Sequence, residues 1–344
     1  MSQDAVQPVT GGAGEAPPQG ASKPAEGAAP AEAAPAVHLL KGDLGQSLKH
    51  AGALRIAGSV CAGVTLEVEG TLNVDGTVES ATVTATGNLT AAGGIVGRGK
   101  GRYVTRESLS ARSVIAATIE ARDNVSVSVE IANSQIVAGG VLNCEQGHLY
   151  GGHATVNGGV QCGTLGSPGG SETVIEAGID EELRRLSEKH SPEIEANQKR
   201  IAKVRMQVEP LMAQQKALTP KQKESATELL YQAGELEERT MGLIADLRAK
   251  VGASYAKSKA EVLVTTMIYP GVTIRFPGFE VTIERAVKGP VRIYKGGKGA
   301  GAKIMMIDLK DNAELFVKYN PHTDPHLAAL GRVLVVPKDK KKAA

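Results

Sequence analysis

The chain repeats a short unit in which two apolar residues, two positions apart, precede a Gly, Asn or Asp corner and a further apolar residue. Successive units start at Leu66, Val83, Val104, Ile119, Ile136 and Val156, with an average spacing of about 18 residues. Apolar residues at alternate positions give a short strand one inward face. A fixed period over several units is typical of repeat architectures. The repeat therefore favours folds in which short strands stack coil upon coil.

The sequence predicts a mainly β fold, a single-stranded parallel β-solenoid, with an α-helical insertion. Glycine adopts positive φ freely and Asn and Asp tolerate it, so we expect the corners to be turns of that kind. The right-handed crossover preferred by parallel strands favours a right-handed β-helix. A thick globular core normally uses aromatic side chains, whereas this chain has 41 Gly, three Phe, seven Tyr and no Trp. A β-meander or sandwich is the alternative.

After Gly178 the apolar period changes to about 3.5, which predicts helices. The first helical arm carries its apolar residues at Ile194, Ile201, Val204, Val208 and Leu211. The second carries a heptad seam at Leu229, Ala233, Leu236, Thr240, Leu243 and Leu247. Two arms joined by one tight turn must run antiparallel, so we expect a coiled-coil hairpin. No third helix is recognisable, and an ordinary helical domain is the alternative.

The ends of the two arms also carry sequence signals. Thr219 is the expected N-cap of the second helix, with Pro220 at its first position and Gln222 completing a capping box. That helix is expected to run to about Gly252. Pro192 and Pro210 are expected to start or kink the first arm rather than lie within a straight helix.

The remaining segments complete a five-part organisation. Residues 1–37 are rich in Ala, Pro and Gly and are expected to be a disordered tail. The solenoid is expected over 38–178, the hairpin insertion over 179–258, a second solenoid part over 259–298, and a C-terminal extension with a basic tail over 299–344. The second part is expected to add coils at Val262, Val272, Val281 and Val291. Strand-like patches in the extension are Ile304–Ile307, Leu315–Val317 and Val333–Val336.

Charge and cysteine content restrict the environment of the chain. The formal net charge is +2, so no overall field attracts nucleic acid or an anionic membrane. Three cysteines cannot form a disulfide framework and suit a reducing compartment. No signal peptide and no apolar run of about 18 residues is recognisable. We expect a cytoplasmic protein without membrane insertion or nucleic-acid binding.

A glycine-rich loop is the first candidate site. Gly94, Gly99 and Lys100 imitate a phosphate-binding loop, but Gly101 replaces the Ser or Thr and no helix is predicted to follow. The alternative is a basic patch for an acidic partner. This candidate partner-binding patch comprises Arg98, Lys100, Arg102 and Arg106. A solvated loop without a binding role is the simpler interpretation.

Two groups of residues have metal-ligand chemistry but unfavourable spacing. They are Cys144, His148, His153 and Cys162, and, separately, His322, Asp324 and His326. Zinc sites usually use closely spaced pairs, whereas Cys144 and Cys162 are one coil apart and more simply stack in the core. Two prolines around the second group suit a turn. We expect no metal and no cofactor.

The sequence offers no catalytic arrangement either. Sugar-cleaving solenoids usually present stacked aromatic residues, and here the predicted first solenoid part contains Tyr103 and Tyr150 alone. Asp75 and Asp123 do not share a repeat position, so they are not expected to form an acid–base pair. We predict that the chain is not an enzyme. A solenoid enzyme acting on sugar or acyl substrates remains a lesser alternative.

Three motifs in order resemble the flagellar assembly protein A family of bacteria. They are the run Gly93–Gly101, the segment Thr173–Gly178 that opens the charged helical region, and Ile268–Arg275 beyond it. The resemblance covers about residues 55–295. It implies a β-solenoid with an inserted coiled coil, a role in flagellar assembly or polar organisation, and no catalytic site. The family's usual N-terminal globular domain is not recognisable, because residues 1–54 are too short and too polar for it.

The leading hypothesis is a non-enzymatic scaffold that binds protein partners, flagellar or cell-pole components among them, or itself, through the solenoid ends or the coiled coil. The alternative is a polymerising cytoskeletal solenoid similar to the bactofilins. Bactofilins share Pro-rich ends and a Gly- and Val-rich core but have no long inserted coiled coil.

Overall fold

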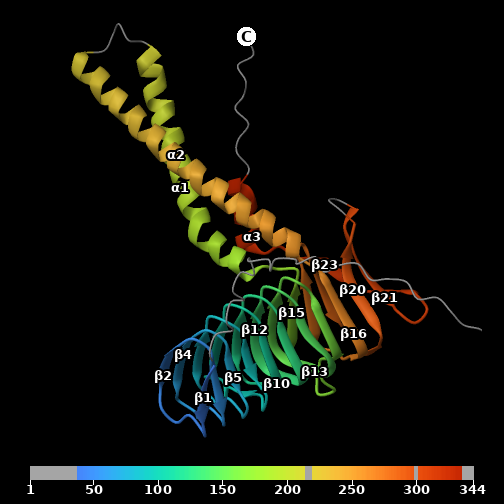
Figure 1. The fold of residues 1–344 in the computed structure, drawn as a ribbon. Coiled ribbons are helices and arrows are strands. Elements are labelled where there is room, and N and C mark those ends of the chain that lie inside the picture. Colours follow the sequence, from blue (N-terminus) through green and yellow to red (C-terminus); the bar gives the residue numbers. More distant parts are fainter. Residues whose placement is uncertain (1–36, 214–218, 298–300, 335–344) are drawn as a thin grey trace, which may run out of the picture. The chain divides into compact units, whose positions relative to one another are not determined.

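A computed structural model describes residues 37–213, 219–297 and 301–334. The predicted disordered tail lies outside these ranges except for Val37, and so does the basic tail from Lys338 to Lys342. The ranges contain a solenoid of about eight turns, mostly of parallel strands, with a helical insertion (Figure 1). The predicted fold class is therefore confirmed.

The solenoid has three walls, each a stack of parallel strand segments. Every turn adds one segment to each wall. The first wall holds β1 (His38–Lys41), β3 (Leu54–Ala57), β5 (Leu72–Val74), β7 (Leu89–Ala91), the start of β10 (Leu109–Ile115), β12 (Val125–Ala138) and β13 (Leu142–Val156), then β14 (Val160–Leu165) and β16 (Glu261–Ile268). The middle wall begins as single bridges at Leu44, Val60 and Val78 and continues through β8 (Ile95–Val96) and the later parts of β10, β12, β13, β14 and β16.

The last wall of each turn completes the coil. It holds β2 (Leu48–Ala51), β4 (Thr65–Glu69), β6 (Thr82–Ala85), β9 (Arg102–Thr105), β11 (Thr118–Ala121), the ends of β12 and β13, β15 (Thr173–Ala177) and β17 (Val272–Phe276). Alternate residues of these strands are buried, as the repeat requires. The core is thus a set of ladders of Leu, Ile, Val and Ala enclosed by the three walls.

The strand register tests the predicted repeat directly. Leu66 lies beside Val83, and Ile119 lies beside Ile136, as predicted. Two predicted starts are wrong. The residue in register with Val83 is Tyr103 rather than Val104, and the residue in register with Ile136 is Ala154 rather than Val156.

Tyr103 explains the first error. Its side chain is fully buried in the core, and its hydroxyl donates a hydrogen bond to the carbonyl oxygen of Glu79 at 2.7 Å. Burial raises the pKa of Tyr103 to about 12. A polar aromatic residue can occupy an inward position when its hydroxyl finds such a partner, which a search for aliphatic pairs overlooks.

The corner glycines serve a different purpose from the one predicted. Among the predicted corners Gly159 has positive φ, but Gly70, Gly87 and Gly158 do not. Instead, a Cβ on Gly158 would lie 2.6 Å from the carbonyl oxygen of Gly140 in the preceding coil. Glycine is needed at these corners because successive coils approach too closely for a side chain.

Polar corner side chains bind the backbone of the next coil. Asn88 accepts a hydrogen bond from the N–H of Ser108 at 3.1 Å, and Asn124 accepts one from the N–H of Val141 at 2.8 Å. Ser59 does the same for Thr77. These bonds satisfy backbone groups that the short strands leave unpaired.

The last coil runs in the opposite direction to the others. β18 (Phe279–Ile283) pairs antiparallel with β17, while β19 (Val287–Lys288) and β20 (Val291–Gly296) pair antiparallel with β16. The expectation that Val281 and Val291 start further coils of the same kind is therefore wrong in direction. The reversed coil covers the end of the core, and β21 (Lys303–Asp308), β22 (Glu314–Leu315) and β23 (Tyr319–Pro321) extend it.

Two long antiparallel helices form the insertion, α1 (Glu181–Ala213) and α2 (Pro220–Lys257). Thr219 caps α2, and Gln222 completes the predicted capping box. Residues buried at seven-residue intervals are Ser187, Ile194, Ile201 and Val208 in α1 and Ala226, Ala233, Thr240, Leu247 and Ser254 in α2. Leu229 of the predicted seam is instead exposed, and Ile244, next to the predicted Leu243, is buried.

Both prolines of the first arm lie inside α1, so neither starts it. The helix continues past them because buried residues on either side hold it to its neighbours: Ser191 and Ile194 flank Pro192, and Val208 precedes Pro210. Packing of one face thus outweighs the lost backbone hydrogen bonds.

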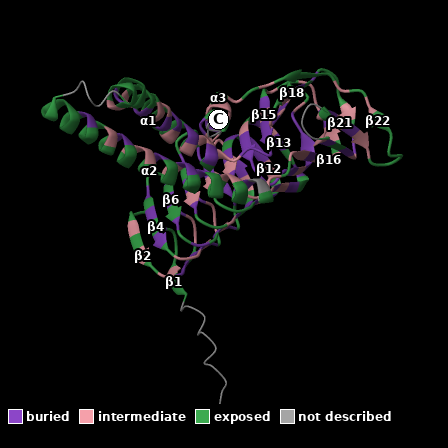
Figure 2. Cartoon of the chain, turned by 90° about the horizontal axis from the view of Figure 1, so that it is seen from above, coloured by how far each residue is buried: buried purple, intermediate pink, exposed green. Residues whose placement is uncertain are grey.

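A third helix, which the sequence analysis did not recognise, packs at the base of the hairpin. α3 (Pro325–Leu334) buries Leu330 and Val333 against Ile194, Ile244 and Leu247. The predicted strand patch at Val333 is therefore wrong, while Ile304 and Leu315 do lie in strands. Figure 2 shows buried residues concentrated in the solenoid and exposed ones covering most of the two long helices.

Candidate functional site at the base of the helical hairpin

The hairpin leaves and re-enters the solenoid at one place. The hydroxyl of Ser258 donates to the carbonyl oxygen of Gly178 at 3.1 Å, and the N–H of Lys259 donates to the carbonyl oxygen of Asn157 at 2.8 Å. The coil that ends with β15 is continued by β16, which lies in register with β14. The helices are thus inserted between two adjacent coils.

Asp180 joins the two helix ends to the solenoid. One of its carboxylate oxygens accepts hydrogen bonds from the N–H groups of Glu182 and Leu183 and so caps α1. The other accepts from the hydroxyl of Ser254 in α2. The side-chain amide of Asn157 donates to the same hydroxyl at 3.2 Å. Ser254 and Asn157 are buried, so this chain of hydrogen bonds fixes the joint between the helices and the solenoid.

Glu176 is the centre of a buried ionic network. Its carboxylate lies 2.9 Å from the guanidinium of Arg184, 3.2 Å from the ring of His153 and 3.6 Å from the guanidinium of Arg275, and it accepts a hydrogen bond from Thr155. Burial raises the pKa of Glu176, but the hydrogen bond from His153 and the charge of Arg184 outweigh burial and lower this pKa to about 2.

Arg184 connects three parts of the chain through the same network. It lies in α1 and binds Glu176 of the solenoid, Glu181 of its own helix at 2.8 Å, and Asp324 at 2.7 Å. Burial lowers the pKa of Arg184, but the carboxylates of Glu176 and Asp324 raise it above its usual value. Asp324 also caps α3 by accepting from the N–H of His326. One guanidinium therefore holds solenoid, hairpin and α3 together.

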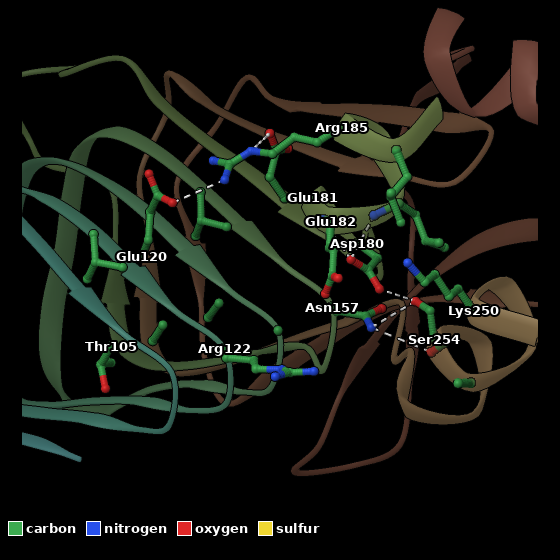
Figure 3. A pocket seen from close by; sticks show the side chains of 18 residues that line it. Thr105, Glu120, Arg122, Asn157, Asp180, Glu181, Glu182, Arg185, Lys250 and Ser254 are labelled. Carbon is green, nitrogen blue, oxygen red and sulfur yellow. Dashed lines mark hydrogen bonds and ion pairs between the residues drawn. The ribbon is translucent and has the colours of Figure 1, made fainter. Parts of the chain in front are cut away.

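A cavity of about 440 Å³, lined by both apolar and charged side chains, lies between the coils and the hairpin base (Figure 3). Glu120, Glu182, Arg122 and Lys250 are among its lining residues. Arg185 crosses it and binds Glu120 at 3.1 Å. No aromatic residue lines the cavity, so it has none of the stacking surfaces that sugar-binding sites usually use.

The four residues of the predicted basic patch are not equivalent. Arg98 lies in the glycine loop with positive φ and contacts Glu79 at 3.6 Å. Arg102 begins β9 and binds Glu120 at 2.7 Å, which links it to the cavity. Lys100 and Arg106 are exposed, and among the described residues no carboxylate pairs with either side chain.

Backbone carbonyl oxygens of the loop itself and of the next coil already accept hydrogen bonds from N–H groups of the glycine loop. The N–H groups of Gly97 and Gly101 donate to carbonyl oxygens of Ile115 and Gly97, and that of Gly99 donates to Ala116. The strand β9 follows the loop. A phosphate would need several free N–H groups and the N-terminus of a helix, whereas these three N–H groups are already bonded and the element that follows is a strand.

The candidate metal ligands are dispersed. Cys144 and Cys162 stack in adjacent coils and are fully buried, and burial raises the pKa of Cys144 to about 11. His148 is exposed on the outside, while His153 binds Glu176. In the described part of the chain no cluster of three or more His, Cys, Asp or Glu side chains is arranged to hold a metal.

The ionic network was missed by sequence reasoning. Glu176 and Arg184 stand near each other at the start of the helical region, but Arg275 and Asp324 come from distant segments. A usable signal was the position of Glu176, a carboxylate between the inward residues Ile175 and Ala177 just before the helical region. In the structure Glu176 is almost fully buried. It can be buried only where cations cover it.

Comparisons with known proteins give one family. A family model described as the flagellar assembly protein A β-solenoid domain matches residues 47–299. No curated protein and no solved structure matches the chain. Among the helices of the described residues, none has an apolar stretch of the length needed to cross a membrane.

Proposed function

Because the chain belongs to the flagellar assembly protein A β-solenoid family, we propose that it is a non-enzymatic, cytoplasmic scaffold of bacterial flagellar assembly that binds protein partners through its helical hairpin. The observation that carries this proposal is a hairpin with a firmly bound base and exposed apolar side chains beyond it. The base supplies a defined position for the arm, and the outer part supplies the contact surface.

The base is held by interactions that are costly to break. Glu176 and Arg184 are both largely buried, and removing one partner of such a pair leaves an uncompensated charge. The apolar contact of Leu330 and Val333 with Ile244 adds a second attachment. A partner bound to the arm would therefore be held at a fixed place relative to the base.

The outer part of the hairpin exposes large apolar side chains. The exposed fractions are 72% for Met206, 64% for Tyr231, 50% for Leu211 and 44% for Leu229. Tyrosine and methionine are enriched in the cores of protein interfaces, and helices commonly dock partners through such side chains. Glu224 and Glu228 line the same shallow hollow of α2 as Tyr231, which favours a partner with basic residues around an apolar contact.

The glycine-loop patch is a second contact in this proposal. Lys100 and Arg106 present charges with no carboxylate partner among the described residues, whereas Arg98 and Arg102 already contact Glu79 and Glu120. We assign all four to a minor role in binding an acidic segment, with Lys100 and Arg106 making the direct contacts.

The polymerising alternative, similar to the bactofilins, receives less support. End-to-end growth requires two open ends, and here β18, β19 and β20 run antiparallel across one of them. An enzymatic role receives less support as well, because Glu120 beside the cavity is paired with Arg185 and Asp180 caps α1.

The test is a double substitution on the arm, Met206→Gln with Tyr231→Gln, introduced in the native cell. We expect flagella and swimming to be lost while the amount of the protein stays unchanged. Phe316→Gln is the matched control, because Phe316 is 94% exposed but lies outside the hairpin. Normal flagella in the double variant, or equal loss in the control, would overturn the proposal.

A further inference from the structure

The two ends of the solenoid differ. At the C-terminal end the reversed coil covers β16 and β17. At the other end β1 pairs with β3 and β2 pairs with β4, and no described strand lies on their outer edges. Leu40 and Leu48 of this first coil are half-buried, whereas their partners Ile56 and Leu66 are fully buried. Within the described part of the chain, the first coil is thus an open end of the core.

Two core ladders finish in histidine at this open end. His38 lies in register with Leu54, which heads a ladder of Leu72, Leu89, Leu109, Val125, Leu142, Val160 and Val262. His50 lies in register with Val68, which is followed by Ala85, Thr105, Ala121, Ala138, Val156 and Ala177. Histidine occurs at these inward positions in the first coil alone.

The two imidazole rings lie side by side, with centroids 5.0 Å apart and planes tilted by 36°. Among the described residues neither ring makes a hydrogen bond or an ion pair, so no contact there occupies the ring nitrogens. Two imidazoles that bind one tetrahedral zinc at about 2.0–2.1 Å hold their ring centres roughly 5 Å apart. The spacing of His38 and His50 fits a pair of ligands to one metal ion.

Within the described residues of one chain, this pair of histidines is incomplete as a metal site. A structural zinc takes four ligands, and the described residues contain no group of three or more candidate ligands. A second copy facing this end through a two-fold axis would supply two more imidazoles. Lys41 and Lys49 lie on the edge strands, and edge lysines oppose direct strand pairing. Direct strand pairing between two copies is therefore disfavoured at this end.

We propose that the open end of the solenoid binds a divalent transition metal of the zinc type through His38 and His50, with the same two residues of a second copy completing the site. The result is a closed dimer joined at the first coils. Because the reversed coil covers the other end, the dimer cannot grow further. This site is independent of the hairpin and of the proposed partner binding.

The test is light scattering of the full-length chain, first with a chelator and then with added zinc chloride. We expect a monomer with the chelator and a doubled mass with zinc, at one zinc per two chains. Cobalt in place of zinc should give the strong visible absorption of a tetrahedral site. His38→Ala and His50→Ala should each abolish the mass increase and the absorption.

His148→Ala is the matched control, since His148 is exposed on the outer surface of the solenoid, and it should dimerise as the unchanged chain does. Circular dichroism establishes that each variant is folded. A mass that zinc does not change would overturn the proposal, as would zinc-induced association that survives both substitutions. Binding of one zinc per chain without association would also overturn it.

Discussion

At the scale of single residues, Glu176 is the side chain on which the joint depends most. Glu176→Gln keeps the shape but removes the charge that compensates Arg184 and Arg275. We expect the free energy of unfolding to fall by roughly 3 kcal/mol, measured by urea denaturation near neutral pH. Glu67→Gln, which breaks the exposed pair with Lys49, should cost less than about 1 kcal/mol. Equal effects would contradict the central role of Glu176.

The carboxylate of Glu176 also determines the direction in which the stability of the fold changes with pH. Its pKa in the folded chain is about 2, below the usual 4.5, so the ionised form favours folding. This contribution is fully present above the unfolded pKa and is lost as the pH falls from about 4.5 towards 2. The stability difference between the unchanged chain and Glu176→Gln should therefore narrow over that range. A difference that stays constant would show that the carboxylate contributes no such linkage.

The close approach of successive coils at Gly158 leads to a third prediction at the residue scale. Gly158→Ala places a methyl group against the carbonyl of Gly140, and we expect a loss of about 1–3 kcal/mol in thermal or urea unfolding. Gly45→Ala is the control, because Gly45 has no atom within 4 Å of the added carbon and no positive φ. It should change stability by less than about 0.5 kcal/mol. A tolerated Gly158→Ala would show that the coils can separate.

Some residue contacts could be predicted from the sequence, and others could not. Period-two apolar pairs predicted the stacking of Ile119 on Ile136 because alternation alone decides which face is inward. They misplaced the coil at Tyr103 because a buried hydroxyl bond is invisible in a pattern of aliphatic residues. The grouping of Glu176 with Asp324 joins residues far apart in the chain, so only the folded arrangement reveals it.

At the scale of elements, the contact of α3 with the hairpin depends on Ile244. Ile244→Ala should remove about 2–5 kcal/mol of local stability, because this side chain packs against Leu330 and Val333. Hydrogen exchange should accelerate in α3 and in the adjoining turns of α1 and α2, while the solenoid amides stay protected. Met241→Ala, on the exposed side of the same helix, should leave exchange unchanged. Accelerated exchange throughout the solenoid would contradict this separation.

Elements were predictable to different degrees. The capping box at Thr219 fixed the start of α2 because its signal is local. The ten residues of α3 were missed because a helix so short depends on packing rather than on its own propensity. The direction of β18 and β20 could not be read from their alternation, which is the same in parallel and antiparallel strands.

At the scale of the whole molecule, the solenoid should fold without the hairpin. We would replace residues 179–257 by a short Gly-Ser linker and change Leu330 and Val333 to Ser, because the deletion uncovers them. The coils on either side remain in register through β14 and β16. We expect a β-type circular dichroism spectrum and a cooperative melt at a lower temperature than that of the full chain. A non-cooperative melt would show that the helices are required for coil stacking.

The adjacency of Gly178 and Ser258 has a consequence for how far the arm extends. Both ends of the insertion meet at one corner, so its length is not tied to the height of a coil. Adding or removing seven residues in each helix would move the tip by about 10 Å and keep the same helix faces in contact. Related chains could thus change the distance between the solenoid and a protein bound at the tip by inserting or deleting helical residues. The stacked coils would stay unchanged.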